Sequence, residues 1–266
     1  MTEAKKVKIM LLKTVSALGQ ERELGSVLSE ICAPETEAEI WSLASVPKLT
    51  NLEYRTYETF VGPDMLRAIR KAEREGFDAV IIGCFMDPHI AAARELSRST
   101  VIVGSCQASL QVASSLGAKF SVLVGAKHWI SHVEELVRHY GYADRLSSVL
   151  PMEIDAADLR DDVATTVTKI IDLGRRAIEE DGADVIVMGC TYTFGMYRAI
   201  QDALNVPVID PAFASFKMAE LLAWQKKTFG WMQSNGVGQQ APPESEIEAF
   251  ELFAVPPAIG CRVEIG

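Results

Sequence analysis

Two cysteines of this chain follow matching sequence segments. Residues 78–84 read DAVIIGC and residues 184–190 read DVIVMGC, so Cys84 and Cys190 stand at a constant offset of 106 residues. A thiolate can remove a proton from one face of a carbon while a thiol delivers a proton to the other face. Two cysteines at equivalent places in a duplicated unit therefore indicate two-base chemistry at a carbon next to a carbonyl, such as racemisation.

This chemistry sets a geometric expectation. If each sulfur lies ~3–3.5 Å from the reacting carbon, the two sulfurs are roughly 7 Å apart, which is too far for a disulfide without backbone movement. We expect a helix directly after each cysteine, so the N–H groups at its N-terminus can lower the thiol pKa and hold a carboxylate or enolate oxygen. The predicted donors are the backbone amides of Phe85, Met86, Thr191 and Tyr192, together with the Thr191 hydroxyl.

A structural interpretation competes with this one, because a cysteine that follows an apolar strand is commonly a core residue. The repeated position of the pair favours a function over that alternative. The chain has three further cysteines without such a match, and we interpret them as structural: Cys32, Cys106 and Cys261.

The duplication extends beyond the cysteines. The same offset pairs Arg70 with Arg176, Glu73 with Glu179, Gly76 with Gly182, Ala108 with Ala214 and Ser109 with Ser215. A duplicated unit tends to form two similar halves related by a pseudo-two-fold axis, so we expect the cysteines to meet in a cleft between them. We predict one domain from 1–104 with 211–266, which carries the last helix and an arm, and a second domain from 105–210.

Short apolar runs alternate with segments of helical spacing along the chain, which indicates an α/β protein with mostly parallel sheets flanked by helices. In such sheets ligands bind beyond the carboxyl ends of the strands, where both cysteines lie. Helices are predicted to begin at 62–64 and at Asp87-Pro88, with the Asp87 carboxylate as the cap. The Gly- and Pro-rich residues 230–243 and the tail after them predict an arm that docks on the body or on a partner subunit.

Bulk properties narrow the partners. The chain has 266 residues, with 36 acidic against 26 basic ones and a net charge of −10, so nucleic acid and anionic membranes are unfavourable partners. No segment approaches the ~20 consecutive apolar residues of a membrane span. We therefore expect a cytoplasmic protein that acts on a small molecule and assembles from identical subunits.

Other residues with chemical potential have simpler explanations. His89 is close to Cys84 in sequence, but a solvent-facing role in the first turn of a helix is the more common one. His128 and His132 have the spacing of metal ligands on a helix, yet no cluster of carboxylates or cysteines accompanies them, so no metal site is predicted. Lys127 is interpreted as a surface residue. Phosphate-binding glycine loops are absent from the sequence.

Three segments resemble a known family. Residues 83–88 (GCFMDP) are similar to the Cys-Phe-x-Asp-Pro segment of hydantoin and allantoin racemases, and residues 206–220 resemble that branch's last strand and helix. Residues 189–191 (GCT) match the second cysteine motif of the wider superfamily. The chain thus resembles the aspartate/glutamate/hydantoin racemase superfamily over residues 6–224, closest to the hydantoin racemase branch. The resemblance implies two similar α/β domains, catalysis without a cofactor, and Cys84 and Cys190 as the acid/base pair.

The differences from the family lie in segments that are expected to contact the substrate. Relatives often carry an Asn-Pro-Asn-like turn in the first loop, where this chain has KTVS with the hydroxyls of Thr14 and Ser16 as candidate donors. The segment after Cys190 is also bulkier than expected. The predicted substrate is a hydantoin or an amino-acid-like compound. The alternatives are cis–trans isomerisation or decarboxylation of small dicarboxylic acids, or a non-catalytic binding domain.

Overall fold

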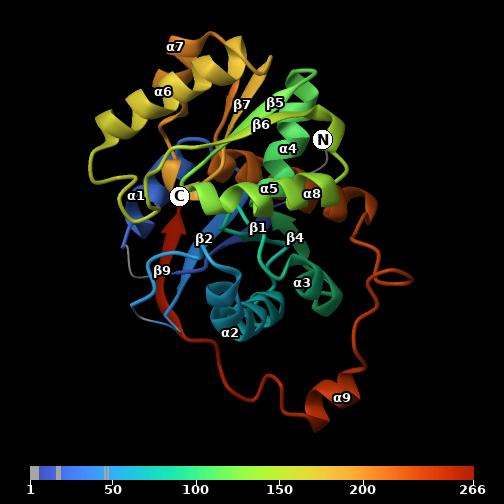
Figure 1. The fold of residues 1–266 in the computed structure, drawn as a ribbon. Helices are drawn as coiled ribbons and strands as arrows, with labels where there is room; N and C mark the ends of the chain where they lie inside the picture. Colours follow the sequence, from blue (N-terminus) through green and yellow to red (C-terminus); the bar gives the residue numbers. More distant parts are fainter. Residues whose placement is uncertain (1–5, 16–18, 45, 47) are drawn as a thin grey trace. The chain divides into compact units, whose positions relative to one another are not determined.

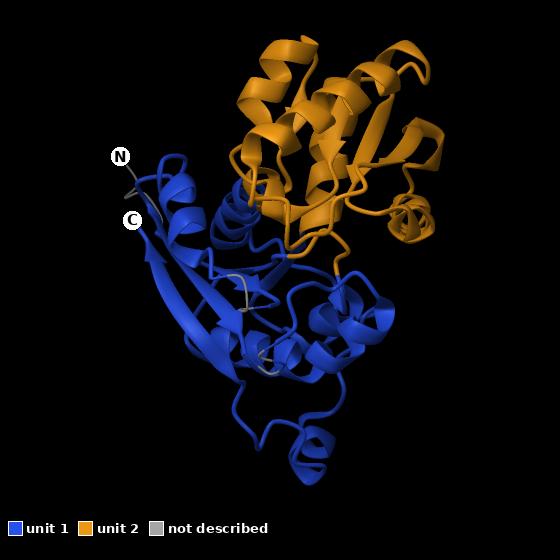
Figure 2. Ribbon diagram, turned by 60° about the vertical axis from the view of Figure 1, so that its left-hand side comes forward, with its two compact units in different colours: residues 1–83, 88–104, 216–266 blue, residues 84–87, 105–215 orange. Residues whose placement is uncertain are grey.

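The computed structural model describes residues 6–15, 19–44, 46 and 48–266. The chain folds as two compact units (Figure 2). Unit 1 contains the described residues up to Gly83 together with 88–104 and 216–266, and unit 2 contains 84–87 and 105–215. The predicted boundaries had assigned 84–87 and 211–215 to the first domain, and both segments lie in unit 2.

Unit 1 is built on a mostly parallel sheet in the order β4-β3-β1-β2-β9 (Figure 1). β9 is antiparallel to β2, and the other neighbours are parallel. The strands are β1 (Val7–Lys13), β2 (Thr36–Leu43), β3 (Ala79–Ile82), β4 (Val101–Gly104) and β9 (Ile259–Ile265). The helices are α1 (Glu21–Ser29), α2 (Arg55–Arg74), α3 (Ile90–Leu96), α9 (Glu244–Ala249) and most of α8 (Pro211–Phe229).

Unit 2 is built on a parallel sheet in the order β6-β5-β7-β8. The strands are β5 (Phe120–Val124), β6 (Leu146–Pro151), β7 (Val185–Met188) and β8 (Val208–Ile209). The helices are α4 (Ser105–Leu116), α5 (Ile130–His139), α6 (Val163–Glu179) and α7 (Tyr197–Leu204), with short 3₁₀ turns η1 (Lys127–Trp129), η2 (Ala143–Arg145) and η3 (Thr191–Thr193).

The two sheets have the same topology, which confirms the α/β prediction. The order β2-β1-β3-β4 in unit 1 corresponds to β6-β5-β7-β8 in unit 2, and β9 is an addition next to β2. Each half also gives its last helix to the other unit. α4 follows β4 of unit 1 but belongs to unit 2, and α8 follows β8 of unit 2 but belongs to unit 1 from Phe216 onwards.

The two strands that precede the cysteines are buried along their whole length. Every residue of β3 and of β7 is buried, as expected for the continuous apolar runs of strands covered on both faces. The turns between α2 and β3 and between α6 and β7 contain Gly76 and Gly182, which adopt φ values of 78° and 71°. Glycine accepts this left-handed conformation without a steric penalty, so the chain can make the same turn before each of the two strands.

The start of α2 corrects the sequence-based expectation. α2 begins at Arg55 rather than at Gly62, because the carbonyl of Tyr54 already accepts hydrogen bonds from the amides of Tyr57 and Glu58 at 2.8 and 3.2 Å. Pro63 therefore lies inside the helix, on an exposed position where water can solvate the carbonyl that loses its N–H partner. α2 has 20 residues, but neither it nor another helix of the described ranges is both long and apolar enough to cross a membrane.

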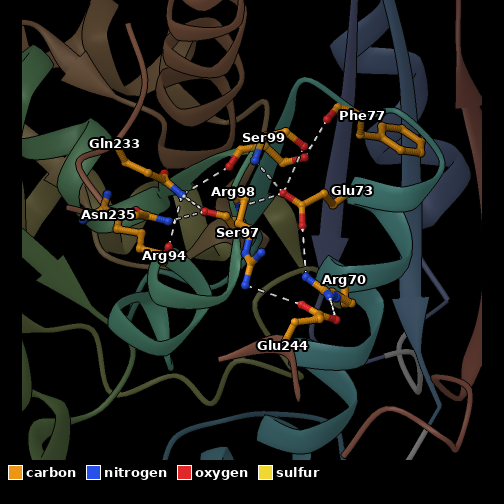
Figure 3. Close-up of polar contacts among 11 residues, drawn as sticks. Arg70, Glu73, Phe77, Arg94, Ser97, Arg98, Ser99, Gln233, Asn235 and Glu244 are labelled. Carbon is orange, nitrogen blue, oxygen red and sulfur yellow. Dashed lines mark hydrogen bonds and ion pairs between the residues drawn. The ribbon is translucent and has the colours of Figure 1, made fainter. Parts of the chain in front are cut away.

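The predicted C-terminal arm docks on unit 1 (Figure 3). The Gln233 side chain accepts a hydrogen bond from the amide of Ile102 at 3.0 Å and donates to the carbonyl of Thr100 at 3.2 Å. Asn235 donates to the carbonyl of Ser97 at 2.6 Å. The chain then returns to pair β9 with β2, so polar side chains and a strand both fix the arm to its own unit.

Candidate active site

The first candidate cysteine follows β3 at the carboxyl end of the strand. The amide of Gly83 donates to the carbonyl of Leu12 at 2.9 Å and so extends the pairing of β3 with β1. A Cβ atom at Gly83 would lie 2.9 Å from the Leu12 oxygen, so the close approach of the backbones requires glycine here. Cys84 comes next, and its carbonyl accepts the amide of Asp87 at 3.1 Å. This hydrogen bond closes a turn that holds Cys84 half-buried against the core of unit 2.

The second candidate cysteine is positioned in the same way. The amide of Gly189 donates to the carbonyl of Leu123 at 2.7 Å, and a Cβ atom at Gly189 would lie 2.7 Å from that oxygen. The carbonyl of Cys190 accepts the Thr193 amide at 3.2 Å and the Thr193 hydroxyl at 2.6 Å. Cys190 is buried and belongs to the hydrophobic core against which Cys84 packs. Both cysteines thus lie in unit 2.

Turns, rather than helices, follow both cysteines. α3 begins only at Ile90 and α7 only at Tyr197, and between Cys190 and α7 the chain forms the three-residue turn η3. The prediction of a helix directly after each cysteine is therefore wrong for Cys84, and after Cys190 it is met only by the three-residue 3₁₀ helix η3, whose N-cap is Cys190. Residues with positive φ interrupt the chain before each helix: Asp87 at 47°, His89 at 55° and Gly195 at 79°. The backbone amides of these turns, rather than a helix dipole, are the remaining candidate donors for a substrate oxygen.

Asp87 joins the first cysteine turn to α4. One carboxylate oxygen accepts the amide of Cys106 at 2.9 Å, and the other accepts the amide of Gln107 at 3.0 Å. The second oxygen also accepts the hydroxyl of Tyr140 at 2.8 Å. Asp87 is buried, with an exposed fraction of 3%. A charged acceptor at the N-terminus of a helix satisfies donors that have no partner inside the helix, so this carboxylate fixes the turn against α4.

This arrangement corrects the predicted role of Asp87. The sequence indicated a cap for the helix that begins near Pro88, but the N-cap of α3 is His89 and no side chain caps that helix. Asp87 instead caps α4, which begins 18 residues further along. α4 offers two orphan amides, and a tyrosine hydroxyl adds a third donor, which explains why the carboxylate turns away from its local helix.

A second buried carboxylate, Asp210, joins the second cysteine turn to α8. It accepts the amide of Gly195 at 2.7 Å from the end of that turn, and the amides of Ala212 and Phe213 at 3.0 and 3.4 Å from the start of α8. Burial raises the pKa of Asp210 to about 6, although these amides and the charge of Arg160 oppose the increase. Under the 106-residue offset α4 and α8 are equivalent helices, so each cysteine turn is tied by one carboxylate to one member of the pair.

Arg160 also holds the second turn. Its guanidinium donates to the carbonyls of Tyr192 and Phe194 at 3.2 and 2.9 Å and lies 3.8 Å from the centre of the Phe194 ring. The planar guanidinium can satisfy two carbonyls and stack on a ring at the same time. Sequence analysis missed Arg160 entirely, because it lies 30 residues before Cys190 in a segment without a motif. The Asp-Pro pair at 210–211 was a usable signal for the Asp210 cap.

The predicted substrate-binding residues fall into three groups. Phe85 and Met86 are buried in the core of unit 2, and Thr191 and Tyr192 are half-buried in η3 of the same unit. Thr14 is buried directly after β1 in unit 1. Ser16 lies outside the described residues. Unit 2 therefore contains both predicted catalytic residues and four of the predicted binding residues: Phe85, Met86, Thr191 and Tyr192.

The remaining candidates have structural surroundings. The His89 ring nitrogen Nε2 lies 2.9 Å from the carbonyl oxygen of Glu58, and the ring packs against Gly62 of α2. Cys106 is fully buried, and burial, followed by the charges of Asp87 and Cys84, raises the pKa of its thiol well above the usual value. Within the described residues, no group of histidine, cysteine and carboxylate side chains has the arrangement of a metal site.

Comparison with known proteins decides the family. A sequence model of the Asp/Glu/Hydantoin racemase family matches residues 11–219. The chain belongs to this family. This family membership confirms the predicted enzyme class, an isomerase of the racemase kind. Similarity to curated hydantoin racemases confirms the predicted likeness to that branch.

Three relatives illustrate the likeness. The chain is 38% identical over 160 residues to the hydantoin racemase of Rhizobium meliloti, in a match that covers 60% of this chain and 66% of the relative. It is 33% identical over 183 residues to the hydantoin racemase of Paenarthrobacter aurescens, covering 68% and 75%. The solved structure of allantoin racemase from Klebsiella pneumoniae has a TM-score of 0.80 and 25% identity, covering 90% of this chain and 94% of that one.

Proposed function

We propose that this racemase family member inverts the acidic ring carbon of a hydantoin without a cofactor, with Cys84 and Cys190 as the acid/base pair. The observation that carries the proposal is the equivalence of the two glycine–cysteine turns. Each follows a buried strand of the duplicated sheet, each depends on a glycine that touches a neighbouring carbonyl, and each adjoins the core of unit 2. The names of the curated relatives support the substrate class.

The reaction needs only proton transfers. One cysteine, as a thiolate, removes the ring proton and becomes a thiol, and the ring carbonyl takes up the charge as an enolate. The other cysteine, as a thiol, delivers its proton to the opposite face and becomes the thiolate. Substrate and product therefore have the same composition, and the enzyme keeps its number of protons but ends the turnover with the thiol proton on the other cysteine. The reverse reaction exchanges the roles of Cys84 and Cys190.

The substrate class follows from acidity. The carbon of a hydantoin ring loses its proton more readily than the α-carbon of a free amino acid, whose carboxylate opposes a second negative charge. A thiolate base suits the more acidic carbon. In this proposal the candidate groups that hold the ring oxygens are the amides of Phe85, Met86, Thr191 and Tyr192 and the hydroxyl of Thr191, all in unit 2.

The test uses a single enantiomer of 5-benzylhydantoin in deuterium oxide. Decay of the circular dichroism signal measures racemisation, and proton NMR measures deuterium incorporation at the ring carbon. We expect Cys84→Ser and Cys190→Ser each to lower the racemisation rate by roughly 10²–10⁴-fold, which is the usual contribution of a positioned acid or base. Cys261→Ser, which changes a half-buried cysteine in β9, is the matched control and should keep full activity.

Three outcomes would contradict the proposal. Full racemisation by either active-site variant would exclude a two-base pair. Release of carbon dioxide from arylmalonates, or conversion of maleate to fumarate, without any change in the hydantoin would assign the site to a decarboxylase or a cis–trans isomerase. Absence of all three activities in the wild-type protein would favour a binding domain.

A further inference from the structure

A cavity of about 280 Å³ lies in unit 1 between α2 and the C-terminal tail. One wall is a basic face of α2, and the other is formed by tail residues that include Phe253 and Val255 and two prolines. The basic side chains recur at positions i, i+3, i+4 and i+7, which places them on one side of a helix. They are Arg67, Arg70, Lys71 and Arg74.

Within the described ranges, six cations, four on this wall and two beside it, lie near only four carboxylates. Arg67 pairs with Asp64 at 3.1 Å, Lys71 pairs with Glu75 at 2.9 Å, and Arg70 contacts Glu73 and Glu244. Arg262 also pairs with Glu75, and Arg98 also pairs with Glu244. Figure 3 shows Arg70 and Arg98 on either side of Glu244. Arg74 forms no ion pair with a carboxylate of the described residues. The hydrogen bond from Arg70 lowers the pKa of Glu244, and the charges of Arg70, Arg98 and Arg74 add to this effect.

Two buried donors have no acceptor. The Nε atoms of Arg67 and Arg70 are buried and make no hydrogen bond within the part of the chain that the structure describes. Arg70 as a whole has an exposed fraction of 9%. A buried donor without an acceptor costs about 1–3 kcal/mol, but these two atoms are shielded from water, so an anion in the cavity would meet the outer guanidinium nitrogens and the Lys71 ammonium and would balance the excess positive charge.

The ordinary role of basic residues in a helix does not account for the whole face. Lys71 and Arg74 lie in the last turn of α2, where cations stabilise the helix dipole. Arg67 and Arg70 lie before that turn, and the dipole effect is confined to it. The opposite wall is apolar on its side-chain surface. A ligand that satisfies both walls therefore carries a negative group and a hydrocarbon body.

We propose that this cavity binds a small organic carboxylate, with its carboxylate on the arginines of α2 and a short hydrocarbon chain against Phe253 and Val255. The volume is close to the lower limit of about 300 Å³ for small-molecule sites, which suits a ligand of hexanoate size. The cavity is lined by residues of unit 1, whereas both cysteines belong to unit 2, and the proposal does not depend on the proposed racemase activity.

The experiment titrates the full-length protein with hexanoate, 1-hexanol and sulfate and follows amide NMR shifts. We expect saturable hexanoate shifts at Ala254 and Val255, weaker binding of sulfate, and no saturable binding of 1-hexanol. Arg74→Gln should weaken hexanoate binding by about tenfold, because a charge-assisted hydrogen bond contributes more than about 1.4 kcal/mol. The matched control is Arg138→Gln, an exposed arginine in the last turn of α5, which should bind hexanoate like the wild type.

A second variant separates ligand contacts from folding. Val255→Asp places a carboxylate on the exposed rim of the cavity, where it should compete for the arginines and abolish hexanoate shifts while the rest of the amide spectrum stays unchanged. Equal hexanoate affinity in the wild type, Arg74→Gln and Val255→Asp would overturn the proposal. So would equal affinity for hexanoate and 1-hexanol, or the absence of saturable shifts at Ala254 and Val255.

Discussion

The carboxylate of Asp87 should determine the local stability of the first cysteine turn and of α4. The informative perturbation is Asp87→Asn, which keeps the shape of the side chain but replaces one acceptor oxygen by a donor. In the native contacts the two oxygens accept the amides of Cys106 and Gln107 and the hydroxyl of Tyr140. Whichever way the asparagine amide is oriented, its NH₂ group faces at least one backbone N–H group.

The expected cost follows from these contacts. A hydrogen bond to a charged group contributes about 1.5–3 kcal/mol, and a buried donor left without an acceptor costs about 1–3 kcal/mol. Asp87→Asn loses one bond completely and the charge assistance of the others, so we expect a loss of about 2–4 kcal/mol. Tyr140→Phe removes one of these bonds and should cost about 1.5 kcal/mol. Because both substitutions affect the same contact, their effects should not add.

Hydrogen exchange at individual amides measures this effect where it arises. In Asp87→Asn the amides of Cys106 and Gln107 should exchange at least about 30-fold faster, which corresponds to about 2 kcal/mol. An internal control is available, because the carboxylate of Asp184 accepts the amides of Ala118 and Lys119 at 3.0 Å each. These two amides should keep their rates. Unchanged exchange at Cys106 and Gln107, or an equal acceleration at Ala118 and Lys119, would refute the assignment of Asp87 as the cap of α4.

Three further predictions concern the second turn and the packing of glycines. Gly189→Ala should lower the free energy of unfolding by about 2–3 kcal/mol in thermal unfolding, because its Cβ would lie 2.7 Å from a backbone oxygen. Gly25→Ala in α1 meets only side-chain atoms at 3.4 Å or more and should stabilise the protein by about 0.5–1 kcal/mol. Equal effects of the two substitutions would contradict this reasoning. Burial raises the pKa of Asp210 from 3.8 to about 6, so Asp210 ionises first in the unfolded state as the pH rises. The stability that this group contributes is fully present below about pH 4 and should fall by up to about 3 kcal/mol by pH 6. The urea midpoint of Asp210→Asn should lack this decrease, and a pH dependence of the midpoint equal to that of the wild type would contradict the prediction. Arg160→Met removes two charged hydrogen bonds to η3 and the residue after it, so iodoacetamide should alkylate Cys190 about tenfold faster. An unchanged alkylation rate would show that the turn is stable without these bonds.

Much of the fold could be predicted from the repeat in the sequence. The duplicated apolar runs before Cys84 and Cys190 are the buried strands β3 and β7, and the duplicated Gly76 and Gly182 take the left-handed conformation in the turns before these strands. These features are local, because they depend on the residue types within a few positions. The start of α2 was not predictable in this way, because the local sequence does not distinguish an exposed proline inside a helix from a proline in its first turn.

The role of Asp87 was not accessible from local sequence, because the choice between two helix N-termini depends on which one the fold brings near. The exchange of the last helices explains the outcome. α4 leaves its own half and joins unit 2, where residues 84–87 also lie, so its first-turn amides meet the carboxylate of the cysteine turn. α8 begins in unit 2 in the same manner, and Asp210 ties its first turn to the amide of Gly195. A duplicated sequence can therefore specify equivalent supports for two cysteines even though the two carboxylates occupy different positions in the repeat.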